Sequence, residues 1–171
     1  MPEFTTFLTF NNQAEEAARF YTSIFPNSKI TRITRYPDLG SPGDAACGEG
    51  ESGGMPTPGS VMTVDFTLNG RPFTALNGGP QFSFSPGISI AAICDTQEEV
   101  DEYWNKFVEA GGTPVACGWI TDHFGVSWQI DPRLLIDLMS DPDPVKAGKA
   151  MRAMMSMVKI DSERLKRAVA E

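Results

Sequence analysis

The side chain in this sequence that is best suited to catalysis is that of Asp65, which lies in one strand of an expected β-hairpin. Two alternating stretches, residues 60–68 and 71–76, are joined by Asn69-Gly70, a dipeptide typical of a two-residue turn with positive φ at both positions. Such a turn places Asp65 opposite Thr74, on a polar face shared with Thr63, Thr67 and Leu76. A carboxylate on this face is a candidate general base if burial raises its pKa.

Few other side chains could take part in catalysis. His123, the single histidine, falls in an expected turn, where it could be a base, a proton shuttle or a solvated turn residue. Cys47, Cys94 and Cys117 are odd in number and far apart, which fits neither a disulfide framework nor a CxxC metal site. We expect them to be reduced structural thiols.

Two tryptophans follow the same alternation near the end of the second half. Trp128 is adjacent to Gln129, so the two side chains should point to opposite faces of a strand, with Trp128 packed under a helix. Trp119 could form the wall of a cavity or pack in the core, and the sequence leaves both open.

Composition and charge narrow the class of protein. The chain has 171 residues with 41% hydrophobic and 21% charged residues, which is typical of a globular protein with a real core. Its formal net charge of -8 disfavours nucleic acid as a partner. The sequence has no apolar run of membrane-spanning length and no basic opening at Met1-Pro2-Glu3, so we expect a cytoplasmic protein without a membrane partner.

These residues are positioned by a pattern that occurs twice. A strand over 4–10, a helix capped by Asn12, a strand over 29–36 and the hairpin form a first βαβββ module over residues 1–80. The same order recurs over residues 81–140, with a strand at 87–93, a Thr96 cap and a helix over 97–110 whose expected inward residues are Val100, Trp104, Phe107 and Val108.

Between the second and third strands of the first module, residues 37–59 are rich in Gly and Pro, and we expect residues 40–59 to form a mobile flap.

The tail over residues 141–171 lies outside the repeat. Asp143-Pro144 predicts the start of a helix, and a second helix is expected around residues 165–169. The segment from Met139 to Val158 carries more apolar surface than one module needs, which predicts a homodimer; the alternative is a tail folded across its own core.

Four motifs resemble a known family: AEEAARFY at 14–21, TALNGG at 74–79, CGWITDHFGVSWQIDP at 117–132 and MRAMMSMVKID at 151–161. They are similar to the PhnB-like group of the glyoxalase, bleomycin-resistance and extradiol-dioxygenase superfamily, often labelled as a 3-demethylubiquinone methyltransferase family. The resemblance implies an α+β fold in which paired βαβββ modules form a cup-shaped sheet, followed here by C-terminal helices. It also implies a homodimer with a ligand or a divalent metal at the floor of the cup.

The metal ligands of that superfamily are missing at the matched positions. Where metal-binding relatives have a carboxylate, this sequence has Gln129 and Thr74, and where they have His it has Thr5, Thr6, Ser89 and Ala91. Hydroxyls and an amide are poor ligands for Zn, Fe or Mn, so we expect no metal and no other cofactor. The expected ligand-binding residues are Asp65, Thr74, Ser89, Trp119 and Gln129.

Three functions remain open at this point. The first is a small-molecule site in the cup, catalytic or not, with Asp65 as the candidate catalytic residue. The second is sequestration of a small molecule or antibiotic without chemistry, as in bleomycin-resistance relatives. The third is a scaffold, favoured if Phe82, Phe84 and Trp119 fill the cup. Methyl transfer is not expected, because no glycine cluster follows the first strand.

Overall fold

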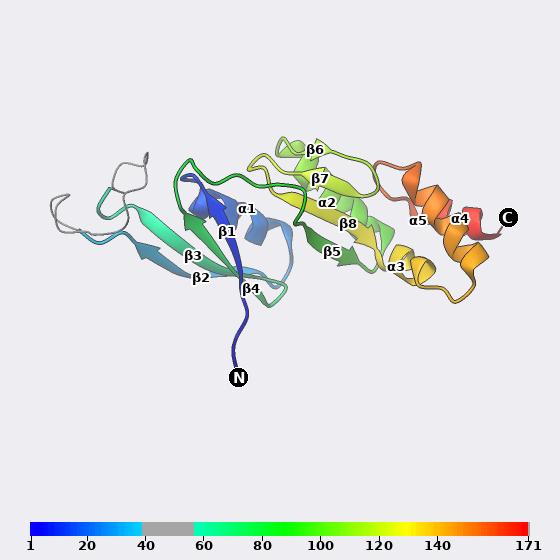
Figure 1. Ribbon diagram of the computed structural model, residues 1–171, viewed down its shortest axis with the longest axis horizontal. Helices are drawn as coiled ribbons and strands as arrows, with labels where there is room; N and C mark the ends of the chain where they lie inside the picture. The colour runs from blue at the N-terminus through cyan, green and yellow to red at the C-terminus, as the bar shows by residue number, and fades with distance from the viewer. Residues whose placement is uncertain (39–56, 171) are drawn as a thin grey trace. The chain divides into compact units, whose positions relative to one another are not determined.

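A computed structural model describes residues 1–38 and 57–170 of the chain, which divides into two compact units, Met1–Ser83 and Phe84–Glu171 (Figure 1). The predicted flap over residues 40–59 lies almost wholly outside the described residues. No helix in the described ranges is long and apolar enough to cross a membrane.

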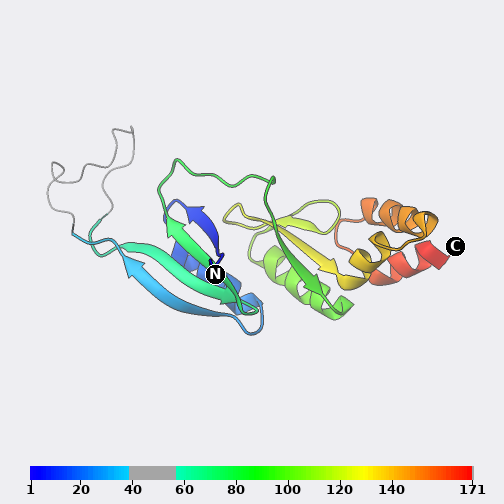
Figure 2. The same cartoon turned by 60° about the horizontal axis from the view of Figure 1, so that its bottom comes forward.

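The first unit is a βαβββ module with one helix against a mixed sheet. Its elements are β1 (Thr6–Phe10), α1 (Ala14–Ile24), β2 (Lys29–Arg35), β3 (Val61–Leu68) and β4 (Arg71–Asn77). The sheet order is β1-β4-β3-β2, with β1 parallel to β4 and the other pairs antiparallel. Helix α1 covers one face (Figure 2) and buries Ala14, Ala17, Ala18, Tyr21 and Ile24 against it.

The hairpin forms as the sequence predicts. Asn69 and Gly70 have φ values of 45° and 80°, and the two-residue turn sets Leu68 opposite Arg71 and Asp65 opposite Thr74. Phe66 pairs with Phe73, and their stacked rings, 5.4 Å apart, lie on the apolar face with Val64 and Ala75. The opposite face therefore presents the polar residues of the hairpin.

The start of α1 differs from the prediction. Asn12 does not cap the helix; the N-cap position is Gln13, without a side-chain hydrogen bond. The backbone N–H of Ala14 instead donates to Oδ1 of Asn77, at 2.8 Å, and Nδ2 of Asn77 donates to the carbonyl of Val61. A distant side chain thus satisfies a group that a local cap usually satisfies.

The second unit repeats the order with β5 (Ile90–Cys94), α2 (Gln97–Glu109), β6 (Thr113–Pro114), β7 (Trp119–Thr121) and β8 (Ser127–Pro132), in the sheet order β5-β8-β7-β6. Thr96 caps α2 by accepting a hydrogen bond from the N–H of Glu99, as predicted. Val108 was expected inside but is 40% exposed, while Tyr103 is buried with Val100, Trp104 and Phe107. The buried stripe is therefore rotated toward Tyr103.

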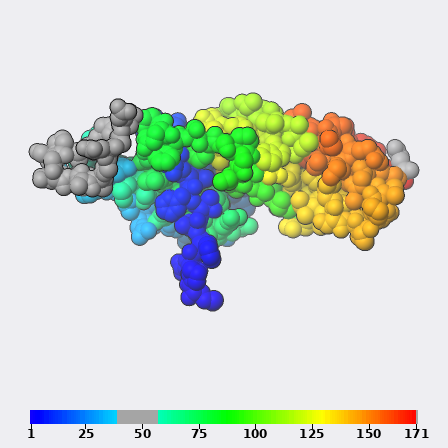
Figure 3. Space-filling model, in the orientation of Figure 1, coloured from blue at the N-terminus to red at the C-terminus, as the bar shows by residue number. Residues whose placement is uncertain are grey.

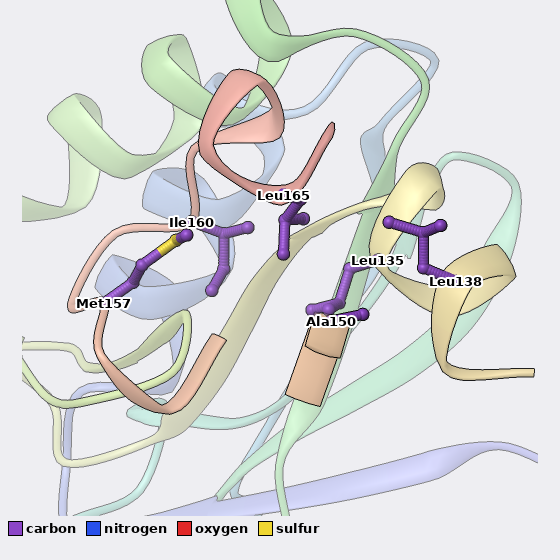
Figure 4. Packing of buried hydrophobic residues seen from close by; sticks show 6 residues of the cluster. All are labelled: Leu135, Leu138, Ala150, Met157, Ile160 and Leu165. Carbon is purple, nitrogen blue, oxygen red and sulfur yellow. The ribbon is translucent and has the colours of Figure 1, made fainter. Parts of the chain in front are cut away.

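Three helices complete the second unit: α3 (Arg133–Met139), which the sequence did not predict, α4 (Pro144–Met155) and α5 (Ser162–Ala170). Their shared core consists of Leu135, Leu138, Ala150, Met157, Ile160 and Leu165 (Figure 4). The tail is attached to the second sheet, because the N–H groups of Cys117 and Gly118 donate to the carbonyls of Met157 and Val158. The space-filling view shows the C-terminal helices in continuous contact with the yellow part of the second unit (Figure 3).

Candidate functional site

The polar face of the first sheet carries a connected group of charged and hydroxyl side chains. Asp65, on β3, accepts a hydrogen bond from Oγ1 of Thr74 at 2.8 Å through its Oδ1 atom. Its Oδ2 atom accepts from Nε and Nη2 of Arg32, on β2, at 2.7 and 2.6 Å. Thr74 is buried, the Asp65 side chain is 22% exposed and that of Arg32 is 71% exposed. The buried Thr74 thus fixes the Asp65 carboxylate, which holds the exposed Arg32 side chain in position.

A β-bulge explains why Arg32 meets Asp65. The β2–β3 register pairs Ile30 with Phe66 and then Arg32 with Asp65, so that Thr31 is the extra residue. Without this bulge, strict alternation would place Thr31 opposite Asp65 and turn Arg32 toward the other face. The hydroxyl of Thr31 donates to the backbone carbonyl of Asp65, which holds the bulge in place.

This arrangement bears on the expected role of Asp65 as a general base. Both of its oxygens already accept hydrogen bonds, one of them charge-assisted. A general base needs an oxygen that faces the proton it will remove. The geometry suits Asp65 for holding Arg32 in position better than for proton abstraction.

The polar face of the second sheet contains the other expected ligand residues. Nε2 of Gln129 donates to Oγ of Ser89 at 2.7 Å, and Trp119 pairs with Gln129 in the antiparallel register of β7 and β8. All three side chains are half-buried. Trp128 points to the opposite face, as predicted, where its ring lies 5.0 Å from that of Phe107 on α2. The five predicted residues therefore form two groups, one in each unit.

The turn that contains His123 is organised by its neighbour Asp122. The buried Asp122 accepts hydrogen bonds from the N–H groups of Phe124 and Val126 and from Nε1 of Trp128, each at 2.9 Å. His123 is exposed, and its ring lies 3.8 Å from that of Phe124. This places His123 on the surface of a turn with a structural carboxylate at its centre.

A second buried carboxylate, Asp131 on β8, has the opposite character. Its side chain is 5% exposed, and its Oδ1 atom has no hydrogen-bond partner within the described residues. Burial raises the pKa of this carboxyl to about 6. Gly118 lies directly against this carboxyl, because a Cβ atom added at Gly118 would overlap Oδ1 of Asp131. The same Cβ would be 3.1 Å from a side-chain carbon of Ile160, so the C-terminal segment also lies next to the carboxyl.

Sequence reasoning did not identify Arg32 or Asp131 as site residues. The bulge that aims Arg32 has no signature in the alternating stretch around it. Asp131 stands before Pro132 at the end of a strand, where an exposed position is the usual expectation, yet its side chain is buried beside Gly118 and Ile160.

The donor atoms at the positions where the sequence comparison expected metal ligands do not fit a divalent transition metal. The Gln129 amide is hydrogen-bonded to Ser89, and the Thr74 hydroxyl donates to Asp65. Within the described ranges, no three His, Cys, Asp or Glu side chains are grouped so that they could hold a metal ion. A divalent ion that leaves water needs ligands of comparable donor strength, which these groups do not supply.

We therefore expect protein purified without a His-tag to contain well under one equivalent of Zn, Fe, Mn or Ni per chain. Elemental analysis by mass spectrometry measures this directly, before and after dialysis against a chelator. One equivalent of such a metal that is lost in Gln129→Ala would contradict the prediction.

The comparisons with known proteins agree with the module order. The model of a family described as 3-demethylubiquinone-9 3-methyltransferase matches residues 2–131. A solved PhnB protein from Bacillus cereus, described by the same methyltransferase name, is 33% identical, with 77% of this chain and 99% of that chain covered and a TM-score of 0.61. None of the curated proteins that were compared matches the chain.

Two further solved structures are more distant. Protein PA1353 from Pseudomonas aeruginosa is 19% identical over 77% of this chain and 98% of its own, with a TM-score of 0.57. A glyoxylase/bleomycin resistance protein/dioxygenase domain from Frankia sp. EAN1pec is 16% identical over 75% of this chain and 94% of its own, with a TM-score of 0.41. The expected α+β class with paired βαβββ modules is confirmed by the element order together with the Bacillus cereus and Pseudomonas structures.

Proposed function

We propose that each of the two polar sheet faces binds a small organic molecule without the help of a metal, in a chain that belongs to the PhnB-like family described as 3-demethylubiquinone-9 3-methyltransferase. Asp65 and Thr74 act in the first unit, and Ser89, Trp119 and Gln129 act in the second. Sites of this kind combine apolar walls with a few fixed polar groups.

The observation that carries this proposal is the hydrogen-bonded group around Asp65. Thr74, Asp65 and Arg32 form a chain of hydrogen bonds on the face opposite α1. The buried hydroxyl of Thr74 fixes the carboxylate, and the carboxylate fixes the cation. A sheet surface that only faces solvent does not need such an arrangement. Such preorganised polar groups lower the entropy that is lost when a ligand binds. The Ser89–Gln129 pair beside Trp119 offers a similar combination of polar atoms and an aromatic ring.

Binding without chemistry is the better supported version of this function. The engagement of both Asp65 oxygens weakens the case for base catalysis. Methyl transfer gains no support either, because no glycine-rich turn separates β1 from α1. A scaffold without a ligand site is less favoured, since Phe82, one of the side chains expected to fill a cavity, is 52% exposed.

The homodimer and the cytoplasmic location stay predictions. Much of the apolar surface between Met139 and Val158 packs into the core shared by α3 to α5, as in the alternative that the sequence left open. Val145, Met151, Met155 and Val158 remain exposed. These side chains are the surface on which a homodimer would depend.

A fragment screen monitored by NMR tests the proposed function. We expect small aromatic fragments to shift the methyl signal of Thr74 and the indole signal of Trp119, while the signals of Ala17, in the buried face of α1, stay in place. Thr74→Val removes the hydroxyl at nearly constant volume and should weaken binding at the first face by roughly threefold to tenfold, since one hydrogen bond contributes about 0.5–1.5 kcal/mol.

The matched control is Thr22→Val, because Thr22 also donates its hydroxyl, but to the carbonyl of Ala18 within α1. It should leave fragment binding unchanged. If none of several hundred fragments shifts either polar face, the proposed function is wrong.

A further inference from the structure

We infer that the ligand group bound at the first sheet is an oxyanion, a carboxylate or a phosphoryl or phosphonyl oxygen, held by the exposed edge of Arg32. This inference rests on the proposed function and specifies the chemical class of its ligand. It follows from the geometry of the ion pair, the charge of the sheet and the bulge that aims the arginine.

The ion pair leaves one edge of the guanidinium available. A guanidinium carries five N–H donors in a fixed plane, and Asp65 accepts only from Nε and Nη2 on one side of it. The side chain is 71% exposed, and its Nη1 side is the fork that binds carboxylate or phosphate in a bidentate manner. Asp65 and Thr74 limit the rotation of the plane, so Arg32 presents this fork in a defined direction.

The charge of the first sheet favours an anion although the whole chain has a net charge of -8. Among the residues of its four described strands, the polar face carries the cations Lys29, Arg32 and Arg35 against a single carboxylate, Asp65. Arg71 pairs with Leu68 and lies on the other face, over the ring of Phe73. Lys29 pairs with Thr67, so it lies on the same face as Arg32 and Asp65. A cationic ligand would meet an excess of positive charge here.

The bulge gives an independent reason to regard Arg32 as a functional feature of this face. An extra residue in β2 costs regular ladder hydrogen bonds, and such bulges are often found where a strand must re-aim a functional side chain. Here the bulge moves a cation from the helix-covered face to the polar face, next to the only carboxylate in the four described strands.

A set of matched fragments that differ in charge tests the inference. Benzoate and phenylphosphonate should shift the Nε–H signal of Arg32 and bind at least tenfold more tightly than benzamide, and benzylammonium should not compete. Arg32→Gln should weaken benzoate binding by at least tenfold and remove the preference over benzamide. Raising the salt concentration should weaken benzoate binding to the wild type.

Arg19→Gln is the matched control. Arg19 pairs with Glu15 through the same Nε and Nη2 atoms, at 3.0 and 2.6 Å, but on the surface of α1, so its loss changes the net charge equally. It should leave benzoate binding within twofold of the wild type. Asp65→Asn retains the cation but loses the carboxylate that fixes its plane, so it should weaken benzoate binding less than Arg32→Gln does and keep the preference for benzoate over benzamide.

The outcomes separate the inference from the proposed function. Equal binding of benzamide and benzoate, or an Arg32→Gln protein that still prefers benzoate, would overturn the oxyanion while leaving a small-molecule site in place. An Asp65→Asn protein that binds benzamide as tightly as benzoate would likewise overturn it, because Arg32 would then be present without selecting the anion. If no fragment of any charge shifts Thr74, Arg32 or Trp119, the proposed function fails as well.

Discussion

Replacing Asp122 by Ala is expected to lower the free energy of unfolding by about 3–5 kcal/mol, because three buried donors lose their acceptor at once. The N–H groups of Phe124 and Val126 and the indole N–H of Trp128 all donate to this carboxylate. Trp128 packs against Phe107 under α2, so the turn and the core of the second unit are joined through one side chain. Urea denaturation followed by circular dichroism measures the change.

Two further variants sharpen this experiment. Asp122→Asn keeps one oxygen for the backbone donors but sets an amide NH2 against the indole N–H, so it should cost about 2 kcal/mol. Asp137→Ala, on the exposed side of α3, should stay within about 0.5 kcal/mol of the wild type. An Asp122→Ala protein within about 1 kcal/mol of the wild type would show that the turn does not depend on these hydrogen bonds.

What the sequence predicted well was decided by local interactions. The register of the hairpin depends on a two-residue turn, so Asn69-Gly70 was enough to place Asp65 opposite Thr74. Thr96 caps α2 through Glu99, only three residues away. The same kind of local pattern assigned Trp128 and Gln129 to opposite faces of β8.

The features that the sequence did not predict, the start of α1 and the position of Arg32, depend on partners that are distant in the sequence. Asn12 has the right spacing for a capping box, yet Asn77, 63 residues from Ala14, provides the acceptor at the start of α1. The spacing alone cannot distinguish a cap from a competing distant side chain. Likewise, alternation predicts which residues of a regular strand share a face, but the extra residue Thr31 reverses the assignment for Arg32.

The candidate site was accordingly predicted in part. Asp65 with Thr74, and Gln129 with Ser89, are each within hydrogen-bond distance, but the roles of these residues stay proposals. The cation that gives the first face its chemistry was missing, because Arg32 acquires its position from a bulge and its partner from another strand. A charge count by strand would have shown the excess of cations even without the register.

Asp131 provides the second large prediction, a dependence of stability on pH. Burial raises the pKa of its carboxyl to about 6 in the folded protein, whereas an unfolded Asp titrates near 3.9. Between these values the folded state binds the proton more tightly than the unfolded state does. The contribution of this group to stability is therefore fully present below about pH 4 and is lost as the pH rises through about 6.

We expect Asp131→Asn, which stays neutral at every pH, to recover that loss. Its free energy of unfolding relative to the wild type should rise by about 2 kcal/mol between pH 4 and pH 7, less than the roughly 3 kcal/mol of an unscreened group. Cys94 does not interfere, because burial raises the pKa of its thiol to about 12. Urea denaturation from pH 4 to pH 8 measures the difference, with Asp137→Asn on the surface of α3 as the control.

The location of Asp131 indicates where the effect should appear first. The carboxyl lies beneath Gly118 and Ile160, at the point where the C-terminal segment joins the second sheet through Cys117 and Gly118. An ionised Asp131 is stabilised when this contact opens to water. Hydrogen exchange at the amides of Cys117 and Gly118 should therefore become faster as the pH rises from 5 to 7. The rates are corrected for intrinsic exchange and expressed relative to the rate of Val64 in the first unit. In Asp131→Asn this ratio should stay constant. Parallel stability curves for the wild type and the Asp131→Asn protein over the whole pH range would contradict both expectations, because the carboxyl would then titrate as it does in the unfolded chain.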